Sequence, residues 1–240
     1  MQLIEEFGEE IRQASTFTGL ARLCIRQFAQ LEVTKMSYHH CPPVGAFDHQ
    51  PTVNVFAHGF PKEWVETYTQ SNFIEIDPIP KRALDGSWPF WWSDLAKSPR
   101  LAVEEVAYFQ AMNDAGLGDG LAISVFGPHA RNGYVGLGFD KPKETFSQAQ
   151  ITRMHIMFNI AHQRYCELVR AILPEDVSLS EREKEILAWI AAGKSNGVIA
   201  SILELSPNTV DTYTRRIFRK FDVADRVTAA LRGASLGVFD

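Results

Sequence analysis

The first 31 residues carry apolar side chains at helical spacing. Leu3, Phe7 and Ile11 recur at intervals of four residues, and the apolar positions within residues 20–31 repeat this pattern. Intervals of three and four residues place side chains on one face of an α-helix. The spacing therefore predicts helical structure over residues 2–31, with one face turned toward a core.

Four β-prone runs follow, at residues 33–39, 52–57, 121–126 and 134–139. Residues 127–133 separate the last two runs and contain glycine, proline and asparagine, which are typical of turns. We therefore expect the last two runs to form a β-hairpin.

Helical patterns surround these runs. A helix is expected to open at Pro61, because proline fits the first helical turn, and to stop or bend at Asp77-Pro78. Residues 88–92 are expected to form an aromatic loop, and further helices are expected over 103–112 and 147–173. Helices on both sides of a run of strands predict an α/β/α sandwich with a central antiparallel sheet.

The last part of the chain shows start and stop signals for four short helices. Ser180 and Glu183 form a capping box, Gly193 is placed to end the first helix, and Ser206-Pro207 marks the start of the third. A fourth helix is expected to begin near Arg226. Four short helices with tight turns predict a helix-turn-helix unit. The fold class is therefore α+β, with domains at 1–173 and 179–240 and a linker at 174–178.

The third of these helices, from about Pro207 to Phe221, has two different faces. Val210, Ile217 and Phe221 form an apolar face, while residues 212–220 contain four positive charges and no negative charge. Arginine suits bidentate contact with guanine, and hydroxyl groups suit phosphates. We expect DNA contacts from this helix and from the turn before the second one, with the following candidates: Lys194, Ser195, Thr209, Thr212, Tyr213, Arg215, Arg216, Arg219 and Lys220.

The overall charge alone argues against a nucleic-acid-binding protein. The chain has 24 Lys+Arg against 29 Asp+Glu, for a net charge of −5, whereas DNA-binding domains usually carry a basic surface. The local charge of the third helix outweighs this sum. Three widely spaced cysteines fit reduced thiols, and no apolar run reaches the length of a membrane span. Together with an acidic amino terminus, these features favour a cytoplasmic protein without a membrane partner.

The carboxy-terminal residues resemble the LuxR-type helix-turn-helix. The resemblance rests on Leu179-Ser180-Glu181-Arg182-Glu183-Lys184-Glu185-Ile186-Leu187-Ala188-Trp189, Gly193-Lys194-Ser195, Ile199-Ala200 and Thr209-Val210. Val198, Tyr213 and Arg216 depart from the residues that are common in that family. The resemblance covers about 60 residues and implies sequence-specific binding to a double-stranded DNA operator.

The amino-terminal residues resemble acyl-homoserine-lactone receptors. The match in type, order and spacing lies at Trp64, Tyr68, Asp77, Pro78, Trp92 and Gly120. Together the two resemblances point to the LuxR-type quorum-sensing transcription factors. They imply a small-molecule autoinducer as regulatory ligand and a homodimer that reads an inverted repeat. RNA polymerase is a further expected partner if the protein is an activator.

The resemblance also implies roles for the candidate ligand-binding residues. Asp77 would accept the amide N–H of the lactone, and the indole of Trp64 would donate to the lactone carbonyl. Aromatic and aliphatic walls are expected from the other candidates: Tyr68, Trp92, Leu117 and Phe60.

Two positions depart from the family pattern at the acyl carbonyl of the ligand. Phe60 stands where a tyrosine hydroxyl is common, and Gly138 or Phe139 stands where a serine or threonine is common. Tyr134 or a water molecule would then have to take over this hydrogen bond. The ligand could accordingly be a different small molecule, or the protein could act without one.

Simpler explanations exist for the same residues. Tryptophan, tyrosine and aspartate often serve as core and cap residues, and Asp77-Pro78 can be a helix stop. His39-His40-Cys41 invites a metal site, but the sequence shows no second ligand pair at a recognisable spacing. We expect no metal and no cofactor other than the regulatory ligand. An enzyme that turns over this ligand is the remaining alternative, although no catalytic motif points to it.

Overall fold

The computed structural model describes residues 2–48, 54–70, 73–173 and 178–239. The chain divides into two compact units, one of Met1–Cys41, Thr52–Pro128 and Asn132–Leu168 and the other of Pro42–Pro51, His129–Arg131 and Val169–Asp240. The expected domain limits stay a prediction, since residues 174–177 of the linker lie outside the described residues.

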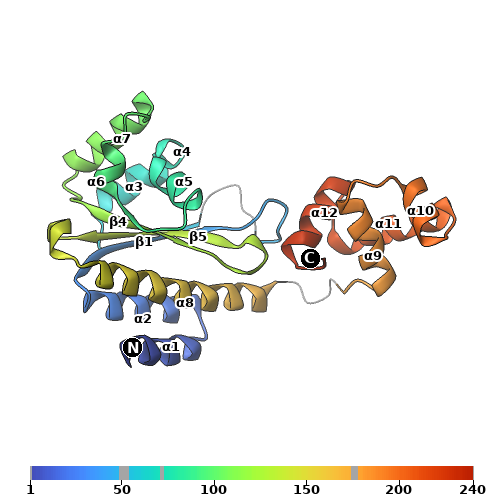
Figure 1. The fold of residues 1–240 in the computed structure, drawn as a ribbon, viewed down its shortest axis with the longest axis horizontal. Helices are drawn as coiled ribbons and strands as arrows, with labels where there is room; N and C mark the ends of the chain where they lie inside the picture. Colours follow the sequence, from blue (N-terminus) through green and yellow to red (C-terminus); the bar gives the residue numbers. More distant parts are fainter. Residues whose placement is uncertain (1, 49–53, 71–72, 174–177, 240) are drawn as a thin grey trace. The chain divides into compact units, whose positions relative to one another are not determined.

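A five-stranded antiparallel sheet forms the centre of the first unit (Figure 1). Its strand order is β2-β1-β5-β4-β3, and the strands are β1 (Val33–Cys41), β2 (Asn54–His58), β3 (Phe90–Trp91), β4 (Gly120–Val125) and β5 (Asn132–Phe139). The predicted hairpin is confirmed, because β4 pairs with β5. Thr52 and Val53 of the predicted second strand lie outside the described residues.

Helices cover both faces of this sheet, as the α/β/α prediction requires (Figure 1). One face packs against α2 (Phe17–Ala29) and α8 (Gln148–Ile172), and α1 (Gln2–Gln13) lies on the outer side of these two helices. The other face lies under α3 (Lys62–Gln70), α4 (Phe73–Ile76), α5 (Pro78–Leu84), α6 (Trp92–Ala96) and α7 (Val103–Asp114).

The α2/α8 face of the sheet carries the larger apolar core. Alternate residues of β4 and β5, such as Ile123, Val135 and Leu137, point into it and are fully buried. Phe28 of α2 stacks on Phe158 of α8 with 3.8 Å between the ring centroids. This core holds the two helices against the strands, so the opposite face is free to differ in composition.

The prediction of a loop over residues 88–92 holds for Trp88 and Pro89 and was wrong for residues 90–92. Phe90 and Trp91 form the edge strand β3, opposite Ala122 and Leu121 of β4, and Trp92 begins α6. Aromatic side chains favour a pleated surface that is half buried. Pairing with β4 therefore outweighs the local turn signal, and it turns the Trp92 side chain into the protein.

Asp77 has a more specific role in the backbone than the expected stop or bend. Helix α4 ends at Ile76 and Asp77 then caps α5, accepting the N–H of Ile79 at 2.8 Å. Pro78 occupies the first position of α5, where a missing N–H costs nothing. The cap fixes both the helix start and the direction of the carboxylate.

The second unit contains the four predicted carboxy-terminal helices, α9 (Glu181–Ala191), α10 (Asn196–Leu203), α11 (Pro207–Phe221) and α12 (Arg226–Ser235). The capping box at Ser180 is present, with both reciprocal hydrogen bonds. Gly193 has φ 75°, the left-handed conformation that ends a helix. Ile186, Ile199 and Phe221 meet in a common core.

Candidate ligand cavity and nucleic-acid interface

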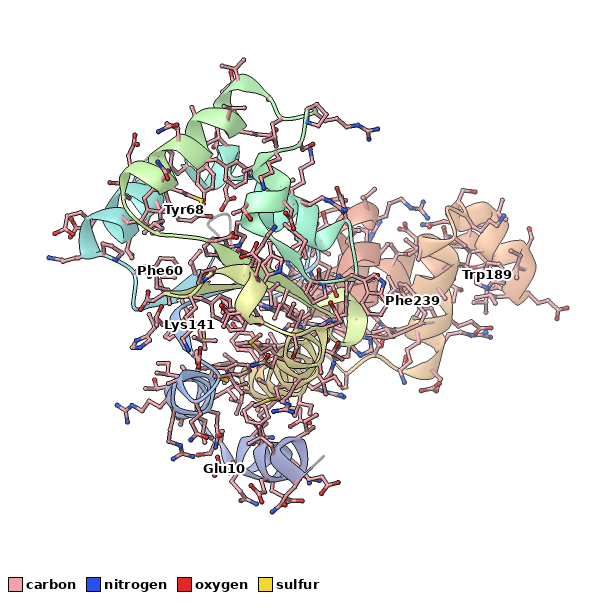
Figure 2. All side chains as sticks on the ribbon, turned by 60° about the vertical axis from the view of Figure 1, so that its left-hand side comes forward. Glu10, Phe60, Tyr68, Lys141, Trp189 and Phe239 are labelled. Carbon is pink, nitrogen blue, oxygen red and sulfur yellow. The ribbon has the colours of Figure 1, made fainter. Side chains whose placement is uncertain are left out.

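A cavity of about 60 Å³ lies between the sheet and the layer of α3–α7. All seven predicted ligand-binding residues line it: Phe60, Trp64, Tyr68, Asp77, Trp92, Leu117 and Tyr134. Figure 2 shows Phe60 and Tyr68 on this side of the sheet, and Glu10 of α1 on the other side. The structure thus brings together residues that are up to 74 positions apart in the sequence. Their role as ligand contacts stays a prediction.

The carboxylate of Asp77 is the centre of the helical wall of this cavity. The hydroxyl groups of Tyr68 and Tyr108 donate to its Oδ2 atom at 2.8 and 2.9 Å, and the N–H of Ile79 donates to Oδ1. A carboxylate has about four lone-pair sites, so three donors leave one acceptor position. The arrangement can accept one further hydrogen bond from a ligand.

Burial raises the pKa of Asp77 to about 6, while the hydrogen bonds from Ile79, Tyr68 and Tyr108 oppose the rise. Removal from water disfavours the charged form, and donors favour it. Near neutral pH the carboxylate is therefore mostly ionised, and it is a stronger acceptor than a neutral oxygen. Burial also raises the pKa of Tyr68, and the neighbouring charge of Asp77 adds to this rise.

The sheet supplies the opposite wall. Ser37 and His39 of β1 and Tyr134 of β5 line the cavity, and Ser37 lies opposite Gly136 in the strand register. The His39 ring is 5.0 Å from that of Tyr134 and 6.0 Å from that of Tyr68. Burial lowers the pKa of His39 to about 4, so its imidazole is neutral at physiological pH.

Trp92 lies between the two walls with an unsatisfied donor. Its side chain is 4% exposed, and its Nε1 atom has no hydrogen-bond partner among the described residues. Burial raises the pKa of Tyr134 well above its usual value, the charge of Asp77 adds to the rise, and the neighbouring indole of Trp92 opposes it. The indole therefore lies beside the Tyr134 hydroxyl without an aligned acceptor for its N–H.

Sequence reasoning missed nine of the lining residues, among them the polar residues Tyr108, Ser37 and His39. Tyr108 lies in α7, and the sequence around it contains no motif. Its place in the site becomes visible only in the structure, where its hydroxyl donates to Asp77. Ser37 and His39 could have been found by strand alternation, because they lie two residues apart on β1 and therefore share one face of the sheet. His39 instead drew attention as a potential metal ligand.

A second cavity, of about 310 Å³, lies on the other face of the sheet. Apolar residues of α2, β1 and α8 line it, including Leu20, Met36 and Phe158. Its polar residues include Tyr38 and His162, and the Tyr38 hydroxyl is 2.9 Å from His162 Nδ1. This cavity has the larger volume, but the described residues show no buried acceptor there comparable to Asp77.

The described residues contain neither a metal-type cluster nor a helix that could span a membrane. No cluster of three or more His, Cys, Asp or Glu side chains there could hold a metal ion. Among the same residues, no helix combines the length and apolar character that a membrane crossing requires.

Helix α11 presents the predicted basic face. Arg215, Arg216 and Arg219 are exposed, and Arg216 lies over the ring of Tyr213 at 5.5 Å. Thr214 and Ile217 point into the core of the unit. The helix therefore offers arginine side chains on its outer face and packs through its inner one.

The other DNA-binding candidates have mixed surroundings. Ser195 caps α10, Thr209 is within 2.8 Å of the Ser206 hydroxyl, and Lys194 and Thr212 are exposed. Lys220 is only partly buried and is held against the unit, donating to Glu183 Oε2 at 2.7 Å and to the carbonyl of Ser178 at 2.8 Å.

Both halves of the chain match known families. Residues 16–165 match the model of the autoinducer binding domain, and residues 177–232 match that of the bacterial regulatory proteins of the luxR family. The chain is a LuxR-type quorum-sensing transcriptional regulator. This family consists of transcriptional regulators and not of enzymes. Its amino-terminal domain takes a small-molecule regulatory ligand, and its carboxy-terminal domain binds DNA.

Individual relatives agree with this LuxR-type assignment. The quorum-sensing regulator RhlR of Pseudomonas aeruginosa is 33% identical over 186 residues, which cover 75% of each chain. The quorum sensing-dependent transcriptional regulator RpaR of Rhodopseudomonas palustris is 30% identical over 76% of this chain and 74% of its own. The crystal structure of Escherichia coli SdiA has a TM-score of 0.78 at 22% identity and covers 98% of this chain and 97% of its own. That likeness shows the shared fold.

Proposed function

We propose that this protein binds an N-acyl-homoserine lactone in the cavity between the sheet and α3–α7 and then binds inverted-repeat DNA as a homodimer. Residues 1–173 form the ligand-binding and dimerisation domain, 174–178 the linker and 179–240 the DNA-binding domain. The observation that carries the proposal is the buried carboxylate of Asp77, which keeps an acceptor position toward a mostly apolar cavity.

The chemistry of the cavity matches the two ends of such a ligand. Asp77 accepts the amide N–H, Trp64 donates its indole N–H to the lactone carbonyl, and aromatic walls cover the apolar parts. A few placed hydrogen bonds in an apolar enclosure are typical of small-molecule sites.

Ligand binding regulates the protein through a shift in its conformational equilibrium. A ligand that binds only the folded or dimeric state stabilises that state by mass action. A two-fold dimer presents two copies of α11 to two half-sites. The protein acts in the bacterial cytoplasm, where the operator lies, and if it is an activator it also contacts RNA polymerase.

The ligand role is tested with Asp77→Asn. The change removes the charge and keeps an oxygen that can cap α5, so we expect a loss of lactone affinity of about 10- to 100-fold, as for a hydrogen bond to a charged group. Titration of the purified protein with N-hexanoyl-homoserine lactone measures it. Asp85→Asn, an exposed change at the other end of the same helix, is the matched control. An unchanged titration of Asp77→Asn would remove Asp77 from the site.

The DNA role is tested on α11. We expect Arg216→Ala and Arg219→Ala each to weaken binding to an operator selected from random duplex DNA by about tenfold, because each removes a base or phosphate contact. Arg182→Ala on α9 keeps the arginine count of the variants equal and serves as control. Wild-type affinity of both α11 variants in a gel-shift titration would exclude this helix face from the interface.

A second candidate function is a receptor of the same architecture for a different small molecule. Phe60 supports it, because its ring lines the cavity without the hydroxyl that is common in the family. Mass spectrometry of small molecules that copurify with the protein separates the candidates. An acyl-homoserine lactone supports the first, and another compound supports the second.

A further inference from the structure

The acyl carbonyl of a bound lactone would find no hydrogen-bond donor at the two positions where the family commonly has a hydroxyl. Phe60 offers no hydroxyl. Of the two last-strand alternatives, Phe139 points into the core on the other face of the sheet, and Gly138 faces the side chain of Lys35. Neither lines the cavity. A carbonyl bound here must find its donors elsewhere.

Gly136 creates such a place on the sheet wall. A Cβ atom at this position would lie 2.6 Å from the Tyr134 hydroxyl, 2.7 Å from Ser37 Oγ and 3.1 Å from Cζ2 of Trp92. These separations are too short for a side chain at residue 136. Because glycine stands there, two hydroxyl groups and one indole converge on the same part of the cavity wall.

The buried indole N–H of Trp92 is the strongest evidence that this wall binds a hydrogen-bond acceptor. Its Nε1–H is buried without a partner among the described residues, and an unpaired buried donor costs free energy. Trp92 lines the cavity, as do Ser37 and Tyr134. Indole is a donor only, and the two hydroxyl groups can donate as well, so the cluster favours an oxygen atom with free lone pairs.

The geometry of an amide connects this wall with Asp77. In a trans secondary amide the N–H and C=O groups point in opposite directions. Asp77 belongs to the helical layer, at the start of α5, whereas Ser37 and Tyr134 belong to the sheet. A ligand amide that donates to Asp77 therefore turns its carbonyl oxygen toward the sheet.

We propose that Ser37, Trp92 and Tyr134 form an oxygen-binding wall that receives the acyl carbonyl of the ligand, in place of the absent hydroxyl at residue 60. This inference rests on the proposed lactone site and assigns the carbonyl end of it. Together with Asp77, this wall selects ligands with an acyl amide, because the N–H and the carbonyl oxygen of such a group point to opposite walls.

The test compares two probes that differ in one atom, N-hexanoyl-homoserine lactone and its thioamide analogue. Sulfur is a weak acceptor, while the N–H that faces Asp77 is kept. For the wild-type protein we expect the thioamide to bind about two- to thirteenfold more weakly, the range of one neutral hydrogen bond. The Trp92→Phe variant should lose most of this difference, because the donor that distinguishes the probes is gone.

Smaller variants and controls keep the test decisive if Trp92→Phe does not fold. Ser37→Ala and Tyr134→Phe should each reduce the difference between the probes. Tyr38→Phe, which removes a hydroxyl on the other face of the sheet, should leave it unchanged, and Asp77→Asn should weaken both probes equally. Equal probe affinities in the wild type, or an undiminished difference in all three wall variants, would overturn the inference. If neither probe binds, the proposed function itself fails.

Discussion

The two faces of the central sheet are built from the same strands and differ in almost every other respect. Toward α2 and α8, β4 and β5 present Ile123, Val135 and Leu137, which fill the larger core. Toward α3–α7, the same strands and β1 present small or polar residues, among them Ser37 and Gly136. Both faces are covered by helices and both border a cavity, but the buried carboxylate of Asp77 lines the cavity of the second face.

One sheet can therefore contribute both to the stability of the fold and to the recognition of a ligand. Successive side chains of a strand point to opposite faces, so each role can change without altering the other. Large apolar residues on one face supply most of the packing energy. Buried polar groups on the other face, such as Asp77 and Trp92, are then tolerated at some cost in stability.

The largest expected effect comes from a change on the packing face. Leu137→Ala removes a fully buried side chain and should lower the free energy of unfolding by about 2–5 kcal/mol. Ser37→Ala on the cavity face should change it by less than about 1 kcal/mol. Urea denaturation of the unliganded variants measures both. Similar losses for the two variants would contradict the division of roles.

A methyl group added to the cavity face should act on the ligand. Gly136→Ala places Cβ among the polar atoms of the sheet wall, and overpacking of about 1–3 kcal/mol corresponds to a loss of lactone affinity of about 5- to 100-fold. Gly133→Ala is the matched control on the same strand, since its Cβ would meet Val125 and Tyr38 on the packing face. The control should lose thermal stability and keep its lactone affinity.

A lower pH should have opposite effects on the two contributions of Asp77, to folding stability and to lactone binding. The pKa of Asp77 is about 6 in the folded protein, above the ordinary 3.8, so burial of its charge costs stability at neutral pH. This cost is relieved as pH falls through 6. In the proposed site the ligand N–H bonds to the ionised carboxylate, so we expect lactone affinity to fall roughly tenfold between pH 7 and pH 5. Calorimetric titration across this range measures it, and a flat profile would rule out an ionised acceptor.

The smallest expected effect concerns one donor to this carboxylate. The hydroxyl of Tyr108 lowers the pKa of Asp77, so Tyr108→Phe should raise that pKa by less than about one unit. The pH at which lactone affinity declines should move upward by the same amount. Phe109→Leu, a neighbouring change without a bond to Asp77, should leave the midpoint in place. A downward shift in Tyr108→Phe would contradict the assigned role of its hydroxyl.

Local patterns were sufficient for most of the fold. Helical spacing, capping residues and strand alternation placed most of the longer helices and strands within a few residues, and the capping box at Ser180 was visible directly. The short helices α5 and α6 were not predicted. The edge strand at Phe90–Trp91 was missed, because its two residues are defined by pairing with β4 and not by a run of their own. Short edge strands depend on tertiary contacts.

The candidate ligand site shows the same limit. Trp64, Asp77 and Trp92 were found because their spacing carries a signature. Tyr108 was not, since its hydroxyl reaches Asp77 only after α7 has packed over α4 and α5. Likewise, Ser37 and Gly136 become neighbours only through the register of β1 and β5. Local sequence patterns cannot predict such contacts between segments that are distant in the chain.

The ion pair between Lys220 and Glu183 reduces the number of counterions that α11 can release from DNA on binding. It ties one of the four cations of the 212–220 segment to the protein fold, so that α11 offers three arginines, and Arg215 already pairs with Asp211. Each neutralised phosphate contributes roughly 0.9 to the slope of affinity against salt. Binding through this helix therefore releases few ions, and a protein with a net charge of −5 depends on matching base contacts to stay on its operator at cellular ionic strength.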